Sequence, residues 1–138
     1  MSYSSWVKSH GEKHKKIMEK LKDLSDDEVI EYFRFDNMVE KEPDFCPLYK
    51  KRKKCHDIEN LNCYLCACPN FRFSDSGFRE IDGKILYSYC SINSKDGKKA
   101  ISQKAIHQDC SFCLIPHKEE FIRKVFKRDW FEIFKENL

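Results

Sequence analysis

The sequence is short of glycine, proline and long apolar runs. Its 138 residues include only four glycines and four prolines, and they form no glycine-rich loop of the kind that cradles phosphates. Apolar runs extend over only a few residues, which excludes a bilayer-spanning helix of about 20 apolar residues. Neither a Ser-His-Asp nor an HExxH arrangement is visible. We therefore expect a non-enzymatic protein, with a three-cysteine zinc site open to water as the catalytic alternative.

The N-terminus lacks the apolar segment of a secretory signal. The stretch MSYSSWVKSHGEKHKK becomes basic where such a signal becomes apolar. We therefore expect a cytoplasmic protein that does not associate with membranes. Because a reducing compartment disfavours structural disulfides, the eight cysteines predict metal or redox chemistry rather than a disulfide framework.

Charge and cysteine are unevenly distributed along the chain. Residues 1–45 carry a net charge of −3, residues 46–117 carry +5 and residues 118–138 carry +1. All eight cysteines lie in the middle segment. We therefore predict an N-terminal helical flank (1–45), a cysteine-rich metal-binding module (46–117) and a C-terminal helical tail (118–138), which together form one compact domain.

The two ends of the chain show helical periodicity. Apolar residues recur every three or four positions over residues 12–24, and Ser25 to Glu28 form a capping-box pattern that starts a second helix. Another apolar and aromatic stripe covers residues 121–134, where Asp129 predicts the restart of a final helix. His10 and His14 lie one turn apart, but the lysines around them favour a solvated face over a metal site.

The middle segment shows little helical periodicity. Asp82-Gly83 separates two apolar stretches and predicts a tight β-hairpin, and Asp96-Gly97 repeats this signal more weakly. Because aliphatic residues are scarce here, a sizeable apolar core is not expected in this segment. The predicted fold is therefore α+β, with a zinc-finger-like, metal-stapled core of loops and hairpins between N-terminal and C-terminal helices.

Cysteine and histidine supply the main functional signal. The candidate metal ligands are Cys46, Cys55, Cys63, Cys66, Cys68, Cys90, Cys110, Cys113 and His117. His56 and His107 are candidates for substitute ligands or for hydrogen-bond donors to a ligand. Two CxxC pairs, Cys63/Cys66 and Cys110/Cys113, could supply four thiolates at about 2.3 Å from one tetrahedral zinc ion.

The remaining four cysteines allow a second zinc site. Cys68 follows Cys66 by two positions, so in extended backbone its side chain would point to the opposite side. Cys63 and Cys66 would then hold one ion while Cys68 serves another, and two cross-braced sites would staple the module. Either Cys90 or His117 completes the second site, and which cysteines share a site stays open.

An iron-sulfur cluster is the main alternative to zinc. Three closely spaced cysteines with a distant fourth can hold a [4Fe-4S] cluster, and ferredoxins also place a proline after a ligand cysteine. Such a protein would serve electron transfer or cofactor biosynthesis. We favour zinc because eight cysteines divide into two tetrahedral sets, whereas one cluster leaves four cysteines unused.

The middle segment resembles the cysteine-rich small domain, a zinc-finger-like family described as metal-binding. The matching stretches are CPLY (46–49), CHD (55–57), NCYLCACPNF (62–71) and DCSFCLIPH (109–117). The resemblance covers about half of the chain. It implies that His117 and the cysteines other than Cys90 belong to the metal-binding framework. It does not imply a reaction, so we expect the protein to act through a partner or ligand.

Five consecutive basic residues lie between Cys46 and Cys55, namely Lys50, Lys51, Arg52, Lys53 and Lys54. A zinc-finger nucleic-acid binder could use them for phosphate contacts. A zinc ion with four thiolates carries a formal charge of about −2, however, so neighbouring basic residues also compensate a metal site. We favour charge compensation or a solvated loop over nucleic-acid binding, because the net charge of the chain is only +3.

Overall fold

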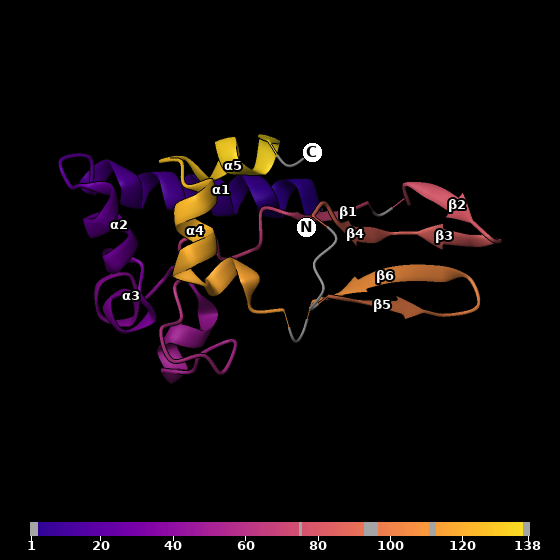
Figure 1. Ribbon diagram of the computed structural model, residues 1–138, viewed down its shortest axis with the longest axis horizontal. Coiled ribbons are helices and arrows are strands. Elements are labelled where there is room, and N and C mark those ends of the chain that lie inside the picture. The colour runs from indigo at the N-terminus through magenta and orange to yellow at the C-terminus, as the bar shows by residue number, and fades with distance from the viewer. Residues whose placement is uncertain (1–2, 75, 93–96, 111–112, 137–138) are drawn as a thin grey trace.

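The computed structural model describes residues 3–74, 76–92, 97–110 and 113–136. The protein has an α+β fold with helices at both ends of the chain and short strands between them (Figure 1). No helix in the described ranges is both long enough and apolar enough to cross a bilayer. In chain order the elements are α1 (Tyr3–Lys20), α2 (Asp26–Tyr32), α3 (Phe35–Lys41), η1 (Pro47–Lys51), β1 (Phe71–Phe73), β2 (Arg79–Ile81), β3 (Lys84–Leu86), β4 (Ser88–Cys90), β5 (Lys98–Ile101), β6 (Ala105–Asp109), η2 (Ile115–His117), α4 (Glu119–Val125) and α5 (Trp130–Glu136).

The strands form two small sheets beside the helices. β1 pairs with β4, and the larger sheet has the strand order β2-β3-β6-β5. All neighbours are antiparallel except β3 and β6, which are parallel. The helices occupy one end of the molecule, and the larger sheet extends away from them (Figure 1).

Local signals in the sequence account for several boundaries. The capping box is confirmed, because the Glu28 amide donates to Ser25 Oγ at 3.2 Å and the Ser25 amide donates to Glu28 Oε1 at 3.1 Å. The hairpin at Asp82-Gly83 is also confirmed, with φ angles of 52° and 79° in a two-residue turn between β2 and β3. The weaker signal at Asp96-Gly97 includes a residue outside the described ranges.

The tail contains two helices, as the periodicity predicts. The Asp129 carboxylate accepts a hydrogen bond from the Phe131 amide at 2.9 Å, at the point where α5 begins. α5 packs closely against α1, because a Cβ on Gly11 would lie 2.3 Å from the Phe131 ring. The glycine at this position therefore lets the first and last helices approach each other.

The first helix differs from its prediction in length and in orientation. α1 begins at Tyr3 rather than near residue 12, and it buries His10 and His14, whose exposed fractions are 8% and 0%. The expectation of a solvated face for these histidines is wrong. Their positions continue the stripe of Ile17 and Leu21 at helical spacing, so they face the core while the lysines beside them face solvent.

One hydrophobic core joins all three segments of the chain. From the middle segment, Leu61, Tyr64 and Leu65 are almost completely buried. The expectation that this segment lacks an apolar core is therefore wrong for its first part, where large side chains pack between the flanking helices. Members from each segment include Ile17, Val29, Phe33, Met38, Tyr49, Leu61, Tyr64, Leu65, Ile122 and Ile133.

Burial of the two histidines predicts a loss of stability in acid. Burial lowers the pKa of His14 from 6.5 to about 3 and the pKa of His10 to about 4. The unfolded chain binds these protons below pH 6.5 while the folded protein does not, so the stability present above pH 6.5 is lost as the pH falls. We expect the free energy of unfolding to fall by on the order of 2 kcal/mol per histidine between pH 7 and pH 5.

Urea denaturation of the metal-saturated protein at several pH values measures this decline. The matched variant is His14→Gln, which keeps an N–H donor but does not titrate in this range. Its stability should decline less steeply than that of the wild type. Parallel declines in the two proteins would show that His14 does not carry the effect.

Candidate metal centre

None of the eight cysteines, all of which lie in the described ranges, forms a disulfide, and their mutual electrostatic effects divide them into two neighbouring groups. We call Cys46, Cys55, Cys63 and Cys66 the first cysteine set. We call Cys68, Cys90, Cys110 and Cys113 the second cysteine set. The sets follow chain order, so the first four cysteines lie together and the last four lie together.

Electrostatic coupling defines the first cysteine set. Burial raises the pKa of Cys63 to about 12, and the nearby thiols of Cys55 and Cys46 raise it further. Burial likewise raises the pKa of Cys66, with contributions from the thiols of the other three members. Neighbouring thiols that would repel one another when ionised form a donor set that a cation would stabilise.

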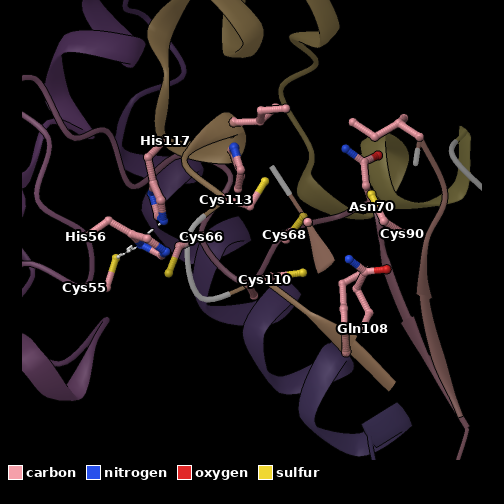
Figure 2. A pocket seen from close by; sticks show the side chains of 16 residues that line it. Cys55, His56, Cys66, Cys68, Asn70, Cys90, Gln108, Cys110, Cys113 and His117 are labelled. Carbon is pink, nitrogen blue, oxygen red and sulfur yellow. Dashed lines mark hydrogen bonds between the residues drawn. The ribbon is translucent and has the colours of Figure 1, made fainter. Parts of the chain in front are cut away.

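The second cysteine set shows the same behaviour. Burial raises the pKa of Cys68 to about 12, and Cys110, Cys90 and Cys113 raise it further. Burial also raises the pKa of Cys110 to about 11, again with contributions from Cys113 and Cys90. Figure 2 shows the labelled side chains of this set around a common space, away from Cys55 and Cys66.

Histidine joins the first cysteine set in a compact triad. Cys55 Sγ lies 3.2 Å from His56 Nδ1 and 3.4 Å from His117 Nε2. A sulfur and a nitrogen bound to the same tetrahedral zinc ion are about 3.5 Å apart. Among the described residues, this triad is the one group of three candidate ligands whose donor atoms all lie within 4.8 Å of one another. The triad therefore has metal-site geometry.

The ring of His117 is oriented by the backbone. His117 Nδ1 lies 2.9 Å from the Asn62 carbonyl oxygen, which can only accept, so Nδ1 carries the proton. Nε2 then presents its lone pair to the triad. Burial lowers the pKa of His117, which favours this neutral form. Metal-binding histidines are commonly oriented by such a bond from the other ring nitrogen.

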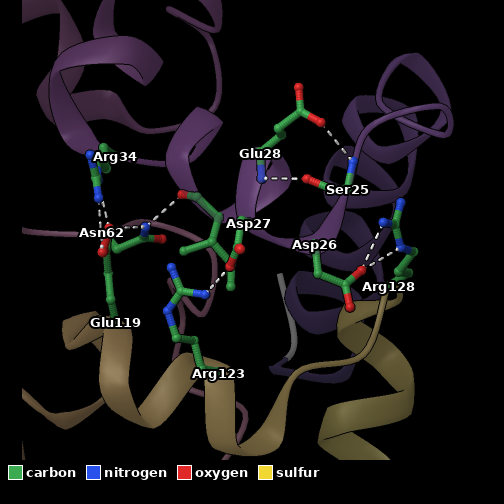
Figure 3. A network of polar contacts seen from close by, with 10 residues as sticks. Ser25, Asp26, Asp27, Glu28, Arg34, Asn62, Glu119, Arg123 and Arg128 are labelled. Carbon is green, nitrogen blue, oxygen red and sulfur yellow. Dashed lines mark hydrogen bonds and ion pairs between the residues drawn. The ribbon is translucent and has the colours of Figure 1, made fainter.

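Asn62 is itself fixed by a buried polar network (Figure 3). Its side chain donates to the Ile30 carbonyl at 2.7 Å and accepts from the Tyr64 amide at 2.9 Å. It also donates at 3.3 Å to Glu119, which forms an ion pair with Arg34 at 2.6 Å. The network connects α2 and α4 to the backbone that orients His117, so the triad is supported from two helices.

A cavity of about 250 Å³ lies between the two cysteine sets. Cys55, His56, Cys66 and His117 line one side of it, and the second cysteine set lines the other (Figure 2). The remaining lining is mostly apolar and includes Phe71, Ile92, Ile115 and Pro116. Members of both cysteine sets therefore line one shared space.

Each cysteine set offers donor atoms that suit a metal ion, but its sulfurs lie farther apart than the ligands of one ion. Four thiolates bound to one zinc ion would lie about 3.8 Å apart. Outside the triad, no three candidate ligands in the described ranges lie within 4.8 Å of one another. Each set would therefore have to contract to place all of its thiolates on a single zinc ion.

The observed grouping differs from the division expected from the CxxC pairs. Cys63 and Cys66 lie with Cys46 and Cys55, rather than with Cys110 and Cys113. The reason is the long excursion through the strands, which carries the second CxxC pair to the far side of the cavity. Cys90 belongs to the second set and His117 to the first, so they do not compete for one position.

The expectation that extended backbone directs Cys66 and Cys68 to opposite sides is wrong. The backbone between them is not extended, because Ala67 and Cys68 have φ angles of 76° and 40°. Two successive residues in the left-handed region reverse the chain locally. This turn, rather than the alternation of a strand, directs Cys68 to the second cysteine set.

Arg72 is a functional candidate that the sequence analysis missed. The residue is 4% exposed, and its guanidinium donates to the carbonyls of Pro69 at 2.5 Å and Phe134 at 2.6 Å. Burial lowers the pKa of Arg72, while negative charge on Cys68 or Cys90 would raise it. A buried cation at this place would offset the negative charge of a thiolate-bound metal. The alternation Phe-Arg-Phe at 71–73, with a charge on the inward face, was the available signal.

Two other predicted candidates lie away from the cavity. His107 stacks on Tyr87 in the sheet, with ring centroids 5.2 Å apart. In the basic run, Arg52 pairs with Glu40 at 2.6 Å, and Lys54 donates to the Ile58 carbonyl at 3.0 Å. Lys50, Lys51 and Lys53 are exposed, so they form the solvated part of the run.

Comparison with known proteins identifies no relative. No family model matches the chain, and no curated protein or solved structure matches it significantly.

Metal binding should release protons from these thiols. In the metal-free protein, pKa values of about 11 to 12 keep Cys63, Cys68 and Cys110 protonated at pH 7.5. A thiol that becomes a ligand must lose its proton, so we expect about three to four protons released per zinc ion. Titration of the weakly buffered protein with zinc, followed with a pH indicator, counts them. Iodoacetamide-treated protein is the control, and release of one proton or fewer per ion would contradict thiolate ligation.

Proposed function

We propose that this protein is a non-enzymatic metal-binding protein in which two cysteine sets hold zinc ions that stabilise its structure. The observation that carries the proposal is the division of the eight cysteines into two groups of four, each with one buried member, Cys63 and Cys113. Structural zinc sites use four such ligands and keep no open position. His117 and His56 would complete or orient the first site beside Cys55.

The surroundings of the cysteines support this proposal. Cys63 belongs to the hydrophobic core, so an ion in the first site would be anchored to the packed helices. The second site would lie where the short strands meet the helices and where Arg72 supplies a buried positive charge. The resemblance of 46–49, 55–57, 62–71 and 109–117 to the cysteine-rich small domain is consistent with the same framework. Action through a partner or ligand stays a prediction from the sequence.

Counting the bound metal in paired variants tests the proposal. We expect two zinc ions in the wild type and one in each of Cys63→Ala and Cys110→Ala. The double variant Cys63→Ala/Cys110→Ala should hold none, because it damages both sites. Its matched control, Cys55→Ala/Cys63→Ala, damages only the first site and should keep one ion. Elemental analysis of gel-filtered protein gives the counts.

The control variant also distinguishes the two ways of dividing the cysteines. If Cys63, Cys66, Cys110 and Cys113 shared one ion, the results for the two double variants would be reversed. A wild-type protein without stoichiometric metal would overturn the proposal altogether.

A second candidate is an iron-sulfur protein with a [4Fe-4S] cluster bound by the second cysteine set. The observation in its favour is the spacing of these thiols around a cavity of about 250 Å³ with an apolar lining. A cluster binds each thiolate through a different iron, so it holds the sulfurs farther apart than a single ion does. Such a protein would serve electron transfer or cofactor biosynthesis.

The colour of the protein separates the two candidates. A protein purified without oxygen should be brown and should bleach in air if the second set holds a cluster, and Cys68→Ala should be colourless. A colourless wild-type preparation that contains two zinc ions would eliminate the cluster.

Nucleic-acid binding through Lys50–Lys54 is less favoured, because Arg52 and Lys54 already make contacts within the protein.

A further inference from the structure

Helix α1 runs alongside the segment that connects the two cysteine sets. His14 Nε2 donates to the Tyr64 carbonyl at 3.1 Å, and Tyr3 Oη donates to the Phe71 carbonyl at 2.9 Å. Between these ends, the His10 ring packs edge-on against Trp130, whose Nε1 donates to the Cys66 carbonyl at 3.1 Å. As the helix proceeds from residue 3 to residue 14, its partners proceed from residue 71 back to residue 64. The helix and the segment are therefore antiparallel neighbours over their whole contact.

The segment needs external support. Ala67 and Cys68 both have positive φ angles, 76° and 40°, and left-handed backbone costs a residue other than glycine roughly 1–2 kcal/mol. Conformations of this kind persist only where the surroundings hold them. The turn at 67–68 also decides that Cys66 faces the first cysteine set and Cys68 the second. The support for this turn therefore sets the relation between the two sites.

The hydrogen bond of His14 explains why a polar ring occupies the core. His14 is completely buried, and its Nδ1 has no hydrogen-bond partner within the described part of the chain. An unpartnered buried nitrogen is costly. A phenylalanine would fill the same space between Phe33 and Tyr64 without that cost. The property that only the histidine offers here is an N–H donor for the Tyr64 carbonyl.

We propose that α1 is a positioning element of the metal centre, in which Tyr3 and His14 hold the segment 64–71 so that Cys66 and Cys68 reach different ions. These side chains touch no metal; they act through the backbone that carries the ligands. Groups that orient metal ligands in this way typically change metal affinity by about 10–100-fold when removed. The inference rests on the proposed function, since it requires both sites to bind metal.

Zinc affinity of the full chain, measured by competition with a chromophoric chelator, tests this role. Tyr3→Phe and His14→Phe each remove one donor and keep the ring, and we expect each to weaken zinc binding about tenfold or more. His14→Gln keeps a donor in place of the ring and should stay within about threefold of the wild type. The matched control is Tyr32→Phe, which removes a hydroxyl bonded to Glu42 at 2.8 Å, outside the segment. Its affinity should be unchanged.

The order of the two His14 variants separates positioning from packing. If the ring mattered only for packing, His14→Phe would bind zinc at least as well as His14→Gln. That order, or wild-type affinity in both Tyr3→Phe and His14→Phe, would overturn the inference while leaving the proposed function intact. If His14→Phe does not fold, Tyr3→Phe at the half-buried start of the helix decides the question. A wild-type protein that binds no zinc would overturn both.

Discussion

The structure depends on hydrogen bonds that side chains make to the backbone of one short segment, residues 62–71. Backbone amides of the segment satisfy the carbonyls of Cys63, Leu65 and Cys68, and its other buried carbonyls need donors from outside the turn. Here His14, Trp130 and Tyr3 donate to the carbonyls of residues 64, 66 and 71, while His117 donates to the carbonyl of residue 62. The aromatic side chains of the core thus serve two purposes. They fill space, and their polar atoms fix the loop that carries three cysteines.

The two cysteine sets have different relations to the core. The first set borders it, since Cys63 is a core member and Cys46 and Cys66 pack against it. The second set lies between the strands and the helices, where the strands bury few large side chains. The helical end of the molecule therefore has apolar packing of its own, whereas the end with the strands has much less. Metal in the second set would replace packing that the sheet does not supply.

The parts of the fold that the sequence predicts are those with local causes. The capping box at Ser25 and the turn at Asp82-Gly83 each depend on a few adjacent residues, and both are confirmed. The burial of His10 and His14 in α1 does not follow from residue type, because histidine among lysines is typical of a solvated face. Their spacing from Ile17 and Leu21 was the better indicator, and it places both histidines on the apolar stripe.

The arrangement of the candidate site was less accessible to sequence reasoning. Every candidate ligand could be named, but spacing alone could not show which ones meet. The parallel pairing of β3 with β6 joins residues about 20 positions apart and, together with the turn at Ala67 and Cys68, decides the grouping. The burial of Arg72 is hard to predict for a similar reason, because it depends on how its strand packs in the folded protein.

The consecutive order of the two sets has a consequence for assembly. The loop between Cys46 and Cys66 is less than half as long as the loop between Cys68 and Cys113. Loop closure costs about 0.6 kcal/mol for each doubling of length. The upstream ring, which metal binding would close between Cys46 and Cys66, therefore forms at the smaller entropic cost. A nascent chain can complete that ring before the strands have been synthesised, except for His117, which arrives last and ties the finished downstream portion back to the beginning.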